Sequence, residues 1–194
     1  MGIYIDIHTH NPNPDHPTPT SAGIHPWHAA TGPLDEAALR AAMLIGEIGL
    51  DFACDVDHTL QEQVFRQQLR LAEQYEKPVV LHCVRAFEPM MRILAEHNLP
   101  AVIFHGFIGS RQQAEQAVKR GYFLSFGEGA FRSPRTIEAM RAIPLSHLFV
   151  ETDESLSPIE EIYEKIACER EIGLEEMQLQ IEKNYNKIFL QQNE

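Results

Sequence analysis

The sequence lacks the features that mark secreted and membrane proteins. Its three cysteines, Cys54, Cys83 and Cys168, are widely spaced and form no CxxC pair, which argues against a thiolate zinc site and favours a reducing compartment. No apolar run approaches the roughly 20 residues of a membrane-spanning helix. The N-terminus reads directly into a predicted strand, without a signal peptide. We therefore expect a cytoplasmic protein with no membrane partner.

Basic residues are also scarce. The chain has 16 Lys and Arg against 28 Asp and Glu, for a formal net charge of −12 with neutral histidines. Broad binding to a nucleic-acid backbone depends on Lys and Arg that neutralise phosphates, so this composition argues against such a surface. Any phosphate-binding site must therefore be local.

No Ser/Gly-rich or highly charged linker interrupts the 194 residues, so we expect a single domain spanning 1–194. The proline-rich stretch 11–20 is expected to be a loop. Elsewhere, short runs rich in Val, Ile and Phe alternate with segments of helical periodicity, which favours a parallel sheet buried on both faces. The expected strands are 3–8, 21–25, 43–48, 78–83, 101–105, 121–126 and 147–152, and the expected helices are 34–43, 58–75, 86–97, 110–120, 134–142, 157–170 and 174–190. Seven strands are one short of a full (β/α) barrel, so we predict an α/β fold of TIM-barrel type that is incomplete or distorted.

Metal-binding residues stand at the ends of these apolar runs. The first run ends in His8-Thr9-His10, and side chains two apart on a strand point to the same face. Parallel βα units gather the carboxyl ends of their strands on one rim, where barrel enzymes keep their active sites. His25 follows another short run, 21–24, and is weighed evenly between a substrate contact and part of a rigid turn. The candidate ligands at the strand ends are His8, His10, Glu47, His82, His105 and Asp153.

Imidazole and carboxylate ligands without thiolates suit zinc, manganese or iron, and magnesium where carboxylates and water dominate. The predicted set is large enough for two divalent ions that share Glu47 and lie about 3.5–4 Å apart. With two carboxylates and one hydroxide, such a centre keeps a net positive charge and attracts an anionic substrate. The remaining histidines follow no apolar strand and are expected to be ordinary core or surface residues: His16, His28, His58, His97 and His147.

Longer motifs extend this pattern along most of the chain. They are Asp6-Ile7-His8-Thr9-His10, Gly23-Ile24-His25-Pro26-Trp27, Gly46-Glu47-Ile48-Gly49-Leu50-Asp51, Gln61 with Phe65, Lys77-Pro78-Val79-Val80-Leu81-His82, His105-Gly106-Phe107-Ile108-Gly109-Ser110, Glu151-Thr152-Asp153, and Asn184 before Phe189. In this order they resemble the motifs of TatD-type metal-dependent hydrolases of the amidohydrolase superfamily. The resemblance implies a TIM-type barrel with a two-metal site at the six candidate ligands. It also implies hydrolysis, with phosphodiester cleavage in DNA as the usual activity.

Three features depart from the resembled pattern. The stretch between the first strand and Gly23 is too short for the expected helix and second strand, so one βα unit is missing. Val84 stands where similar proteins usually carry an arginine, and Arg85 follows one position later. After Asp153, segment 154–158 leads directly into a helix without the longer basic loop common in the family.

The leading interpretation is a deoxyribonuclease-type hydrolase in which a hydroxide activated by two metal ions attacks a phosphoester of DNA ends or of a small phosphodiester. Asp153 would orient or deprotonate the water, and Glu47 would bridge the ions. Arg85, Arg111 and Arg132 are expected to contact a few phosphates.

Two alternatives remain open. The same ligands suit attack on the carbonyl carbon of an amide, lactone or cyclic ureide, because phosphorus and carbon electrophiles use the same nucleophile. The chain could instead be a non-catalytic metal-binding protein. A homo-oligomer that covers open sheet edges is also left open.

Overall fold

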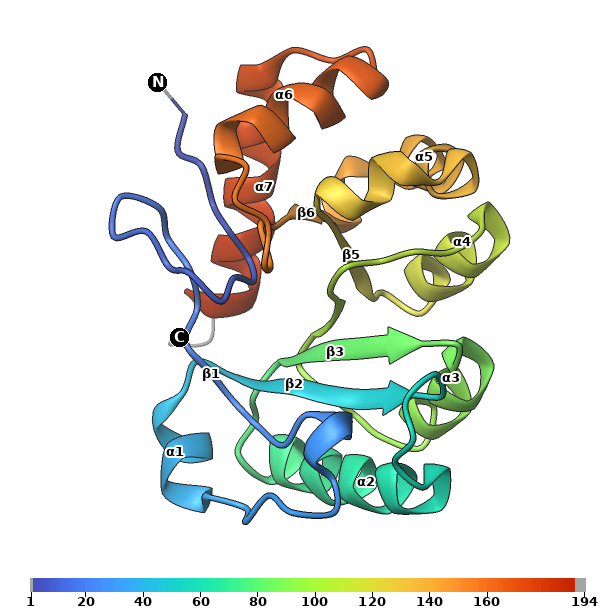
Figure 1. The fold of residues 1–194 in the computed structure, drawn as a ribbon. Coiled ribbons are helices and arrows are strands. Elements are labelled where there is room, and N and C mark those ends of the chain that lie inside the picture. The colour runs from blue at the N-terminus through green and yellow to red at the C-terminus, as the bar shows by residue number, and fades with distance from the viewer. Residues whose placement is uncertain (1, 191–194) are drawn as a thin grey trace. The chain divides into compact units, whose positions relative to one another are not determined.

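The computed structural model describes residues 2–190 (Figure 1). Six β-strands alternate with helices, and the strand pairs within each part of the chain are parallel, as expected for an α/β fold. The chain divides into two compact units. Unit 1 is formed by Met1–Thr18 and His105–Glu194, and unit 2 by Pro19–Phe104.

Unit 2 contains four parallel strands in chain order, with helices packed against them. The buried side chains of Phe65 and Leu69 on α2 face the sheet, where Ile45, Ile48 and Leu50 are also buried. Figure 1 shows α2 alongside β2 and β3, consistent with the packing of α2 on β2. The elements are β1 (Ser21–Ala22), η1 (Pro26–His28), α1 (Glu36–Ala41), β2 (Leu44–Asp51), α2 (His58–Gln74), β3 (Val79–Val84), α3 (Phe87–Leu94) and β4 (Val102–Phe104).

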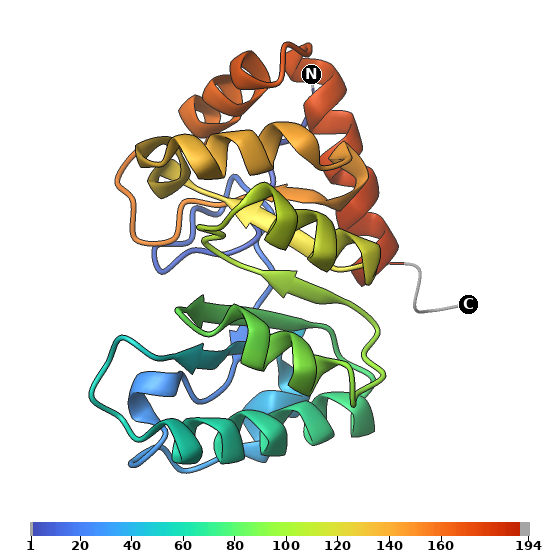
Figure 2. The same cartoon turned by 90° about the vertical axis from the view of Figure 1, so that its right-hand side faces the viewer.

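The described residues of unit 1 form a parallel pair of strands and four α-helices. Helix α4 begins with a capping box in which Ser110 and Gln113 satisfy each other's backbone N–H groups. Helix α5 begins with Ser133 as N-cap and Pro134 in its first turn, and α4 and α5 run side by side (Figure 2). The elements are α4 (Arg111–Lys119), β5 (Phe123–Phe126), η2 (Glu128–Arg132), α5 (Pro134–Ala142), η3 (Leu145–His147), β6 (Leu148–Val150), α6 (Ile159–Glu169) and α7 (Leu174–Phe189).

The predicted helices are all present, and α5 has the predicted bounds. The others are shorter than predicted at one or both ends, most clearly α3, which ends at Leu94 rather than residue 97. None of the helices within residues 2–190 is both long and apolar enough to cross a membrane.

The predicted strand 3–8 is wrong as a regular strand, so the described residues hold six strands rather than seven. This extended segment follows β6 and the residues after it: Ile7 N donates to Val150 O (3.0 Å), and Asp153 N donates to His8 O (3.0 Å). A single bridge pairs Thr9 with Asp153. These hydrogen bonds are too few to form a β-ladder, because other groups form hydrogen bonds with part of the segment's backbone.

Those other groups are a tyrosine and the proline-rich loop. The Tyr163 hydroxyl of α6 accepts from Ile5 N (3.1 Å) and donates to Ile5 O (2.9 Å). Asp6 N donates to Pro17 O (3.1 Å), so the loop folds back along the segment. Both backbone groups of the buried Ile5 are therefore satisfied by one side chain.

We expect Tyr163→Phe to lower the free energy of unfolding by about 1–3 kcal/mol, because it leaves the buried N–H and C=O of Ile5 without their partner. Urea unfolding of both proteins measures this difference. Tyr185→Phe is the matched control, because that tyrosine is only partly buried, and we expect a change below about 0.5 kcal/mol. Equal losses in the two variants would contradict the proposed role of the hydroxyl.

Candidate metal centres

A first group of side chains in unit 1, called cluster 1, consists of His8, His10, His105, Glu151 and Asp153. His8 Nε2 lies 3.6 Å and His10 Nε2 lies 3.4 Å from Asp153 Oδ1. His105 Nδ1 lies 3.6 Å from Glu151 Oε1. Donor atoms of His8, His10 and Asp153 lie within 4.8 Å of one another, as do those of His105, Glu151 and Asp153. Such separations suit donors around a divalent ion, whose bonds to N and O are about 2.0–2.2 Å long.

Asp153 is held in an unusual backbone conformation. Its φ is 54°, in the left-handed region that residues other than glycine adopt at a cost of roughly 1–2 kcal/mol. Hydrogen bonds on both sides fix it, since Asp153 N donates to His8 O and His10 N donates to Asp153 O, each at 3.0 Å. Strained residues of this kind concentrate at functional sites. The same hydrogen bonds set the spacing between Asp153 and the two histidines.

A buried carboxylate also joins the two segments of cluster 1. Thr152 N and the Thr152 hydroxyl both donate to Asp6, at 3.0 Å and 2.6 Å. Burial raises the pKa of Asp6 to about 6, although the hydrogen bonds from Thr152 oppose this shift. Asp6 therefore links the segment that carries His8 to the segment that carries Asp153.

Glu151 was not among the predicted ligands, although it belongs to the motif Glu151-Thr152-Asp153. Its side chain is only 1% exposed, and Gly106 N donates to Oε1 at 2.5 Å. Among the described residues, no hydrogen bond reaches its buried Oε2. Burial would raise the pKa of Glu151, but the adjacent imidazoles of His105 and His8 bring it below its ordinary value. The signal in the sequence was its position two residues before Asp153, which places both on the same side of an extended chain.

A second group, called cluster 2, lies in unit 2 and consists of His25, Glu47 and His82. Glu47 Oε2 lies 3.8 Å from His25 Nε2 and 3.7 Å from His82 Nδ1. The two imidazole rings have their centroids 4.4 Å apart. His25, which the sequence left between a turn and a functional role, therefore stands beside two predicted ligands.

Glu47 does not end its strand as predicted, because β2 continues to Asp51. The pairing with β3 shifts between Ile45 and Ile48, so that Gly46 and Glu47 together oppose one residue, Val80. A bulge of this kind redirects a side chain. A Cβ atom on Gly46 would collide with the Val80 side chain, so only glycine fits this close approach. His82 likewise lies inside β3 rather than at its end.

Two buried glutamines of α2 fix the backbone around cluster 2. Gln61 accepts from Asp51 N (2.7 Å) and donates to Asp51 O (2.9 Å). Gln68, seven positions further along the helix, accepts from Ile24 N (2.6 Å) and donates to Ile24 O (3.1 Å). The residues next to His25 and at the end of β2 are therefore held by the same helix.

The Asp51 side chain also contacts a residue of cluster 2, which the sequence did not predict. Its Oδ2 accepts from the Trp27 indole N–H (2.7 Å) and lies 3.1 Å from His82 Nε2. Burial would raise the pKa of Asp51, but hydrogen bonds from Trp27, Ala53 N and His82 bring it below its ordinary value. Asp51 ends the motif Gly46-Glu47-Ile48-Gly49-Leu50-Asp51, yet no feature of this motif indicates a contact with His82, 31 positions later.

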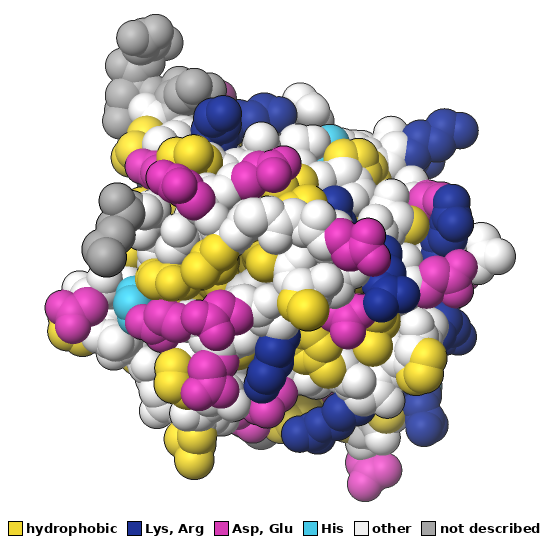
Figure 3. Space-filling model, turned by 90° about the horizontal axis from the view of Figure 1, so that it is seen from above, with side chains coloured by type: hydrophobic (Ala, Val, Ile, Leu, Met, Phe, Trp, Pro, Cys, Tyr) yellow, Lys and Arg dark blue, Asp and Glu magenta, His cyan; other side chains and the backbone are white. Residues whose placement is uncertain are grey.

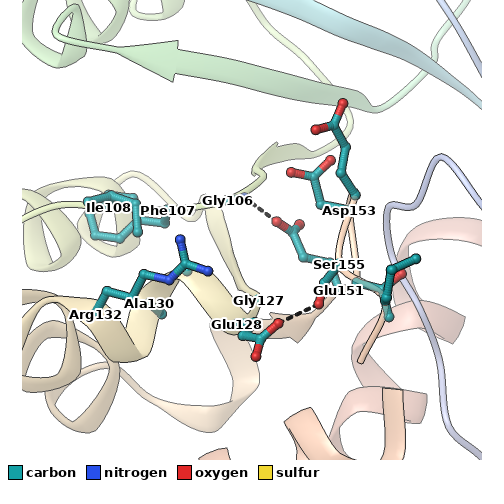
Figure 4. A pocket seen from close by; sticks show the side chains of 14 residues that line it. Gly106, Phe107, Ile108, Gly127, Glu128, Ala130, Arg132, Glu151, Asp153 and Ser155 are labelled. Carbon is teal, nitrogen blue, oxygen red and sulfur yellow. Dashed lines mark hydrogen bonds between the residues drawn. The ribbon is translucent and has the colours of Figure 1, made fainter. Parts of the chain in front are cut away.

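A pocket of about 610 Å³ adjoins cluster 1 within unit 1. Figure 4 shows Ile108 and Arg132 on one side of it and Glu151 and Asp153 on the other. Glu128 forms part of its wall, where Oε2 accepts from the hydroxyls of Ser155 (2.6 Å) and Ser157 (3.0 Å). These hydroxyls lower the pKa of Glu128. The short segment that follows Asp153 is therefore tied to η2.

The three predicted substrate arginines lie in different places. Arg132 lines the pocket that contains Asp153. Arg111 opens α4 and pairs with Glu115, with Nε 2.7 Å from Oε1, and it lines a separate depression. Arg85 follows β3 in unit 2, is exposed, and has a φ of 52°. Within unit 1, the structure therefore brings Arg132 but not Arg111 into the pocket beside cluster 1.

Comparison with known proteins agrees with this set of motifs. The model of the TatD related DNase family matches residues 15–190. The uncharacterized metal-dependent hydrolase YjjV of Escherichia coli (strain K12) is 39% identical over 120 residues, which are 59% of this chain and 46% of that protein. The 3'-5' ssDNA/RNA exonuclease TatD of Citrobacter rodentium is 33% identical over 147 residues, which are 69% of this chain and 56% of that protein. The chain thus spans about half the length of the curated relatives it matches.

Solved structures show the same fold. The crystal structure of the TatD homologue YjjV from Escherichia coli K12 aligns with a TM-score of 0.80 and 27% identity, covering 89% of this chain and 77% of that chain. A TatD family hydrolase of Entamoeba histolytica aligns with a TM-score of 0.78 at 19% identity, covering 91% of this chain and 76% of that chain. Because the family model covers most of the sequence, the chain belongs to the TatD-related DNase family.

Proposed function

We propose that the protein is a metal-dependent hydrolase that cleaves phosphoester bonds in DNA ends or small phosphodiesters. The observation that carries the proposal is a cluster of imidazole and carboxylate donors beside a pocket that also contains Arg132. The donors suit a divalent metal, and the arginine suits a phosphate. The names of two relatives, a metal-dependent hydrolase and a 3'-5' ssDNA/RNA exonuclease, point in the same direction.

The residues present fit divalent ions. Both clusters combine imidazoles with carboxylates and contain no thiolate, which suits zinc, manganese or magnesium. In cluster 1, the buried Glu151 Oε2 accepts no hydrogen bond from the described residues, and a bound cation would satisfy it. Ions bound at the two clusters would lower the pKa of water and withdraw charge from a phosphoryl oxygen.

The protein's own side chains would activate the water and bind the phosphate. Asp153 would orient the attacking water and accept its proton, since its Oδ1 is fixed near His8 and His10 and its backbone is held on both sides. Arg132 would bind a phosphate oxygen from the facing wall of the pocket. A bridging role for Glu47 and an incomplete TIM-type barrel stay predictions, because cluster 1 and cluster 2 belong to different units.

The pocket and the charge of the chain favour a small substrate or the end of a strand. A volume of about 610 Å³ falls within the range of small-molecule sites, about 300–1,000 Å³. On the face seen in Figure 3, the described Lys and Arg side chains are interspersed with acidic and neutral ones and form no continuous basic band. With a net charge of −12, binding would depend on a few local contacts.

Metal titration tests the two clusters. We expect calorimetry on chelator-treated protein to show two divalent ions per chain, because each cluster supplies at least three donors. His8→Ala should remove one of them. His97→Ala is the matched control, since His97 pairs with Glu73 (2.8 Å) and belongs to neither cluster, and it should bind like wild type. Equal metal uptake by the two variants would refute the assignment of cluster 1.

The Glu47→Ala variant distinguishes a centre in which two ions share this carboxylate from two independent metal sites. If Glu47 bridges the ions, this variant should lose both and be the most damaging single change, as the sequence analysis predicts. Loss of one ion only would show that cluster 2 binds its ion independently. The measurement is metal content after dialysis, by atomic emission.

Asp153→Asn should lower metal-dependent phosphodiester hydrolysis at least about 100-fold, because the amide cannot accept a proton from water. The substrates are end-labelled single-stranded DNA and bis(p-nitrophenyl) phosphate. Asp15→Asn, an exposed isosteric change in the loop after residue 10, should keep full activity, and Asp153→Asn purified in the same way controls for contaminating nuclease. Turnover of an amide or lactone without any phosphodiester cleavage would replace the proposed substrate class with an amidohydrolase one.

The salt dependence of DNA binding tests Arg132. The logarithmic slope is about −0.7 per neutralised phosphate on single strands, so Arg132→Ala should make it shallower by about that amount. Arg111→Ala should change it less, because that guanidinium is paired with Glu115. A larger effect of Arg111→Ala would place the phosphate contact elsewhere. Fluorescence anisotropy of a labelled oligonucleotide gives both slopes.

A further inference from the structure

Trp27 is the only tryptophan of the chain, and its environment is unusual for an exposed aromatic residue. The side chain is 55% exposed, yet its indole N–H donates to Asp51, which is only 4% exposed, at 2.7 Å. A tryptophan that only fills a surface turn does not require a hydrogen bond to a buried carboxylate. The hydrogen bond therefore fixes the orientation of a ring that remains accessible.

The ring stands beside cluster 2. The centroid of the indole lies 4.7 Å from that of His25, at an interplanar angle of 79°, and 5.9 Å from that of His82, at 74°. The accessible aromatic surface is therefore adjacent to residues that would hold a metal ion. A flat ring in such a place suits stacking with an aromatic group of a ligand.

Asp51 connects this ring with the candidate ligand His82. The Asp51 Oδ2 atom that accepts from Trp27 also lies 3.1 Å from His82 Nε2, whereas His82 Nδ1 faces Glu47 at 3.7 Å. A proton on Nε2 makes this contact a hydrogen bond and leaves Nδ1 available for a metal. Asp51 is itself rigid, because Ala53 N donates to Oδ1 (2.8 Å) and Gln61 holds its backbone.

We propose that Trp27 is a stacking platform for an aromatic ring of the substrate, and that Asp51 is the positioning residue that orients both this platform and His82. For a nucleic-acid or nucleotide substrate, the stacked ring is a nucleobase. The inference rests on the proposed function for its substrate class. It adds that a base on the ligand strengthens binding, and that sugar phosphates without a base bind more weakly.

Intrinsic fluorescence tests the platform directly, because Trp27 is the only source of tryptophan emission. With protein loaded with Mg²⁺, dAMP should quench the emission, and 2-deoxyribose 5-phosphate should not. By calorimetry, Trp27→Ala should weaken dAMP binding by about 5- to 100-fold and leave the sugar phosphate unaffected. Trp27→Phe, which keeps an aromatic face but cannot donate to Asp51, should restore part of the affinity. Leu179→Ala, which removes another exposed apolar side chain, should bind both probes like wild type.

Two results would overturn the platform. One is equal affinity of Trp27→Ala and wild type for dAMP. The other is a wild-type protein that binds dAMP no more tightly than the sugar phosphate. Neither measurement requires turnover, so a protein that binds dAMP through Trp27 but hydrolyses no phosphodiester would contradict the proposed function and leave the stacking role established.

The role of Asp51 has its own readouts. Asp51→Asn should lower the steady-state anisotropy of Trp27 emission and weaken divalent metal binding by about 10- to 100-fold, because an amide has one acceptor oxygen and cannot accept from Ala53 N on one side and from Trp27 and His82 on the other. Asp55→Asn, an exposed change nearby, should alter neither. In the metal-free wild type, ¹⁵N NMR should show His82 with its proton on Nε2. A proton on Nδ1 would refute the positioning role, and this result depends only on the wild-type protein. An Asp51→Asn variant with unchanged anisotropy and metal affinity would also refute it.

Discussion

The need to satisfy backbone polar groups that strand pairing leaves without a partner shapes much of this structure. A buried N–H or C=O without a partner costs free energy comparable to a lost hydrogen bond. Here side chains supply the partners: Tyr163 for Ile5, Gln61 for Asp51, and Gln68 for Ile24. Each of these contacts lies in or next to a segment that carries candidate ligands. The polar groups that replace sheet pairing therefore also set the positions of the site.

The two clusters reach a defined geometry by different means. Cluster 1 depends on sparse backbone pairing between an extended N-terminal segment and the residues after β6, with Asp153 held in a left-handed conformation. Cluster 2 depends on a bulge in β2 and on the two glutamines of α2. In both, groups beyond the donors fix the donor orientation, which is what tight metal binding requires. The Asp51 contacts to His82 and Trp27 extend this principle from the donors of cluster 2 to the neighbouring aromatic ring.

Departures from the predicted pattern occur where long-range contacts compete with local propensity. Segment 3–8 has the composition of a strand, but Tyr163 and the loop ending at Pro17 take backbone groups that a ladder would use. Glu47 was expected at a strand end, yet β2 continues to Asp51 because the bulge absorbs one extra residue and pairing resumes beyond it. Neither event leaves a signature in the local alternation of apolar and polar residues.

The sequence by itself determined the α/β class, the helices, and the order of motifs that identifies the family, because these depend on local periodicity and on residue types at short spacing. All six predicted ligands lie in cluster 1 or cluster 2, but within either unit only His8, His10 and Asp153 form a group by themselves; there the group of His105 includes Glu151, and the group of Glu47 and His82 includes His25. Only the tertiary structure decided that Glu151 enters cluster 1, that Arg132 rather than Arg111 reaches its pocket, and that Asp51 links Trp27 to His82. These relations join residues distant in sequence, and they arise from strand pairing, burial and hydrogen bonding that no single segment encodes.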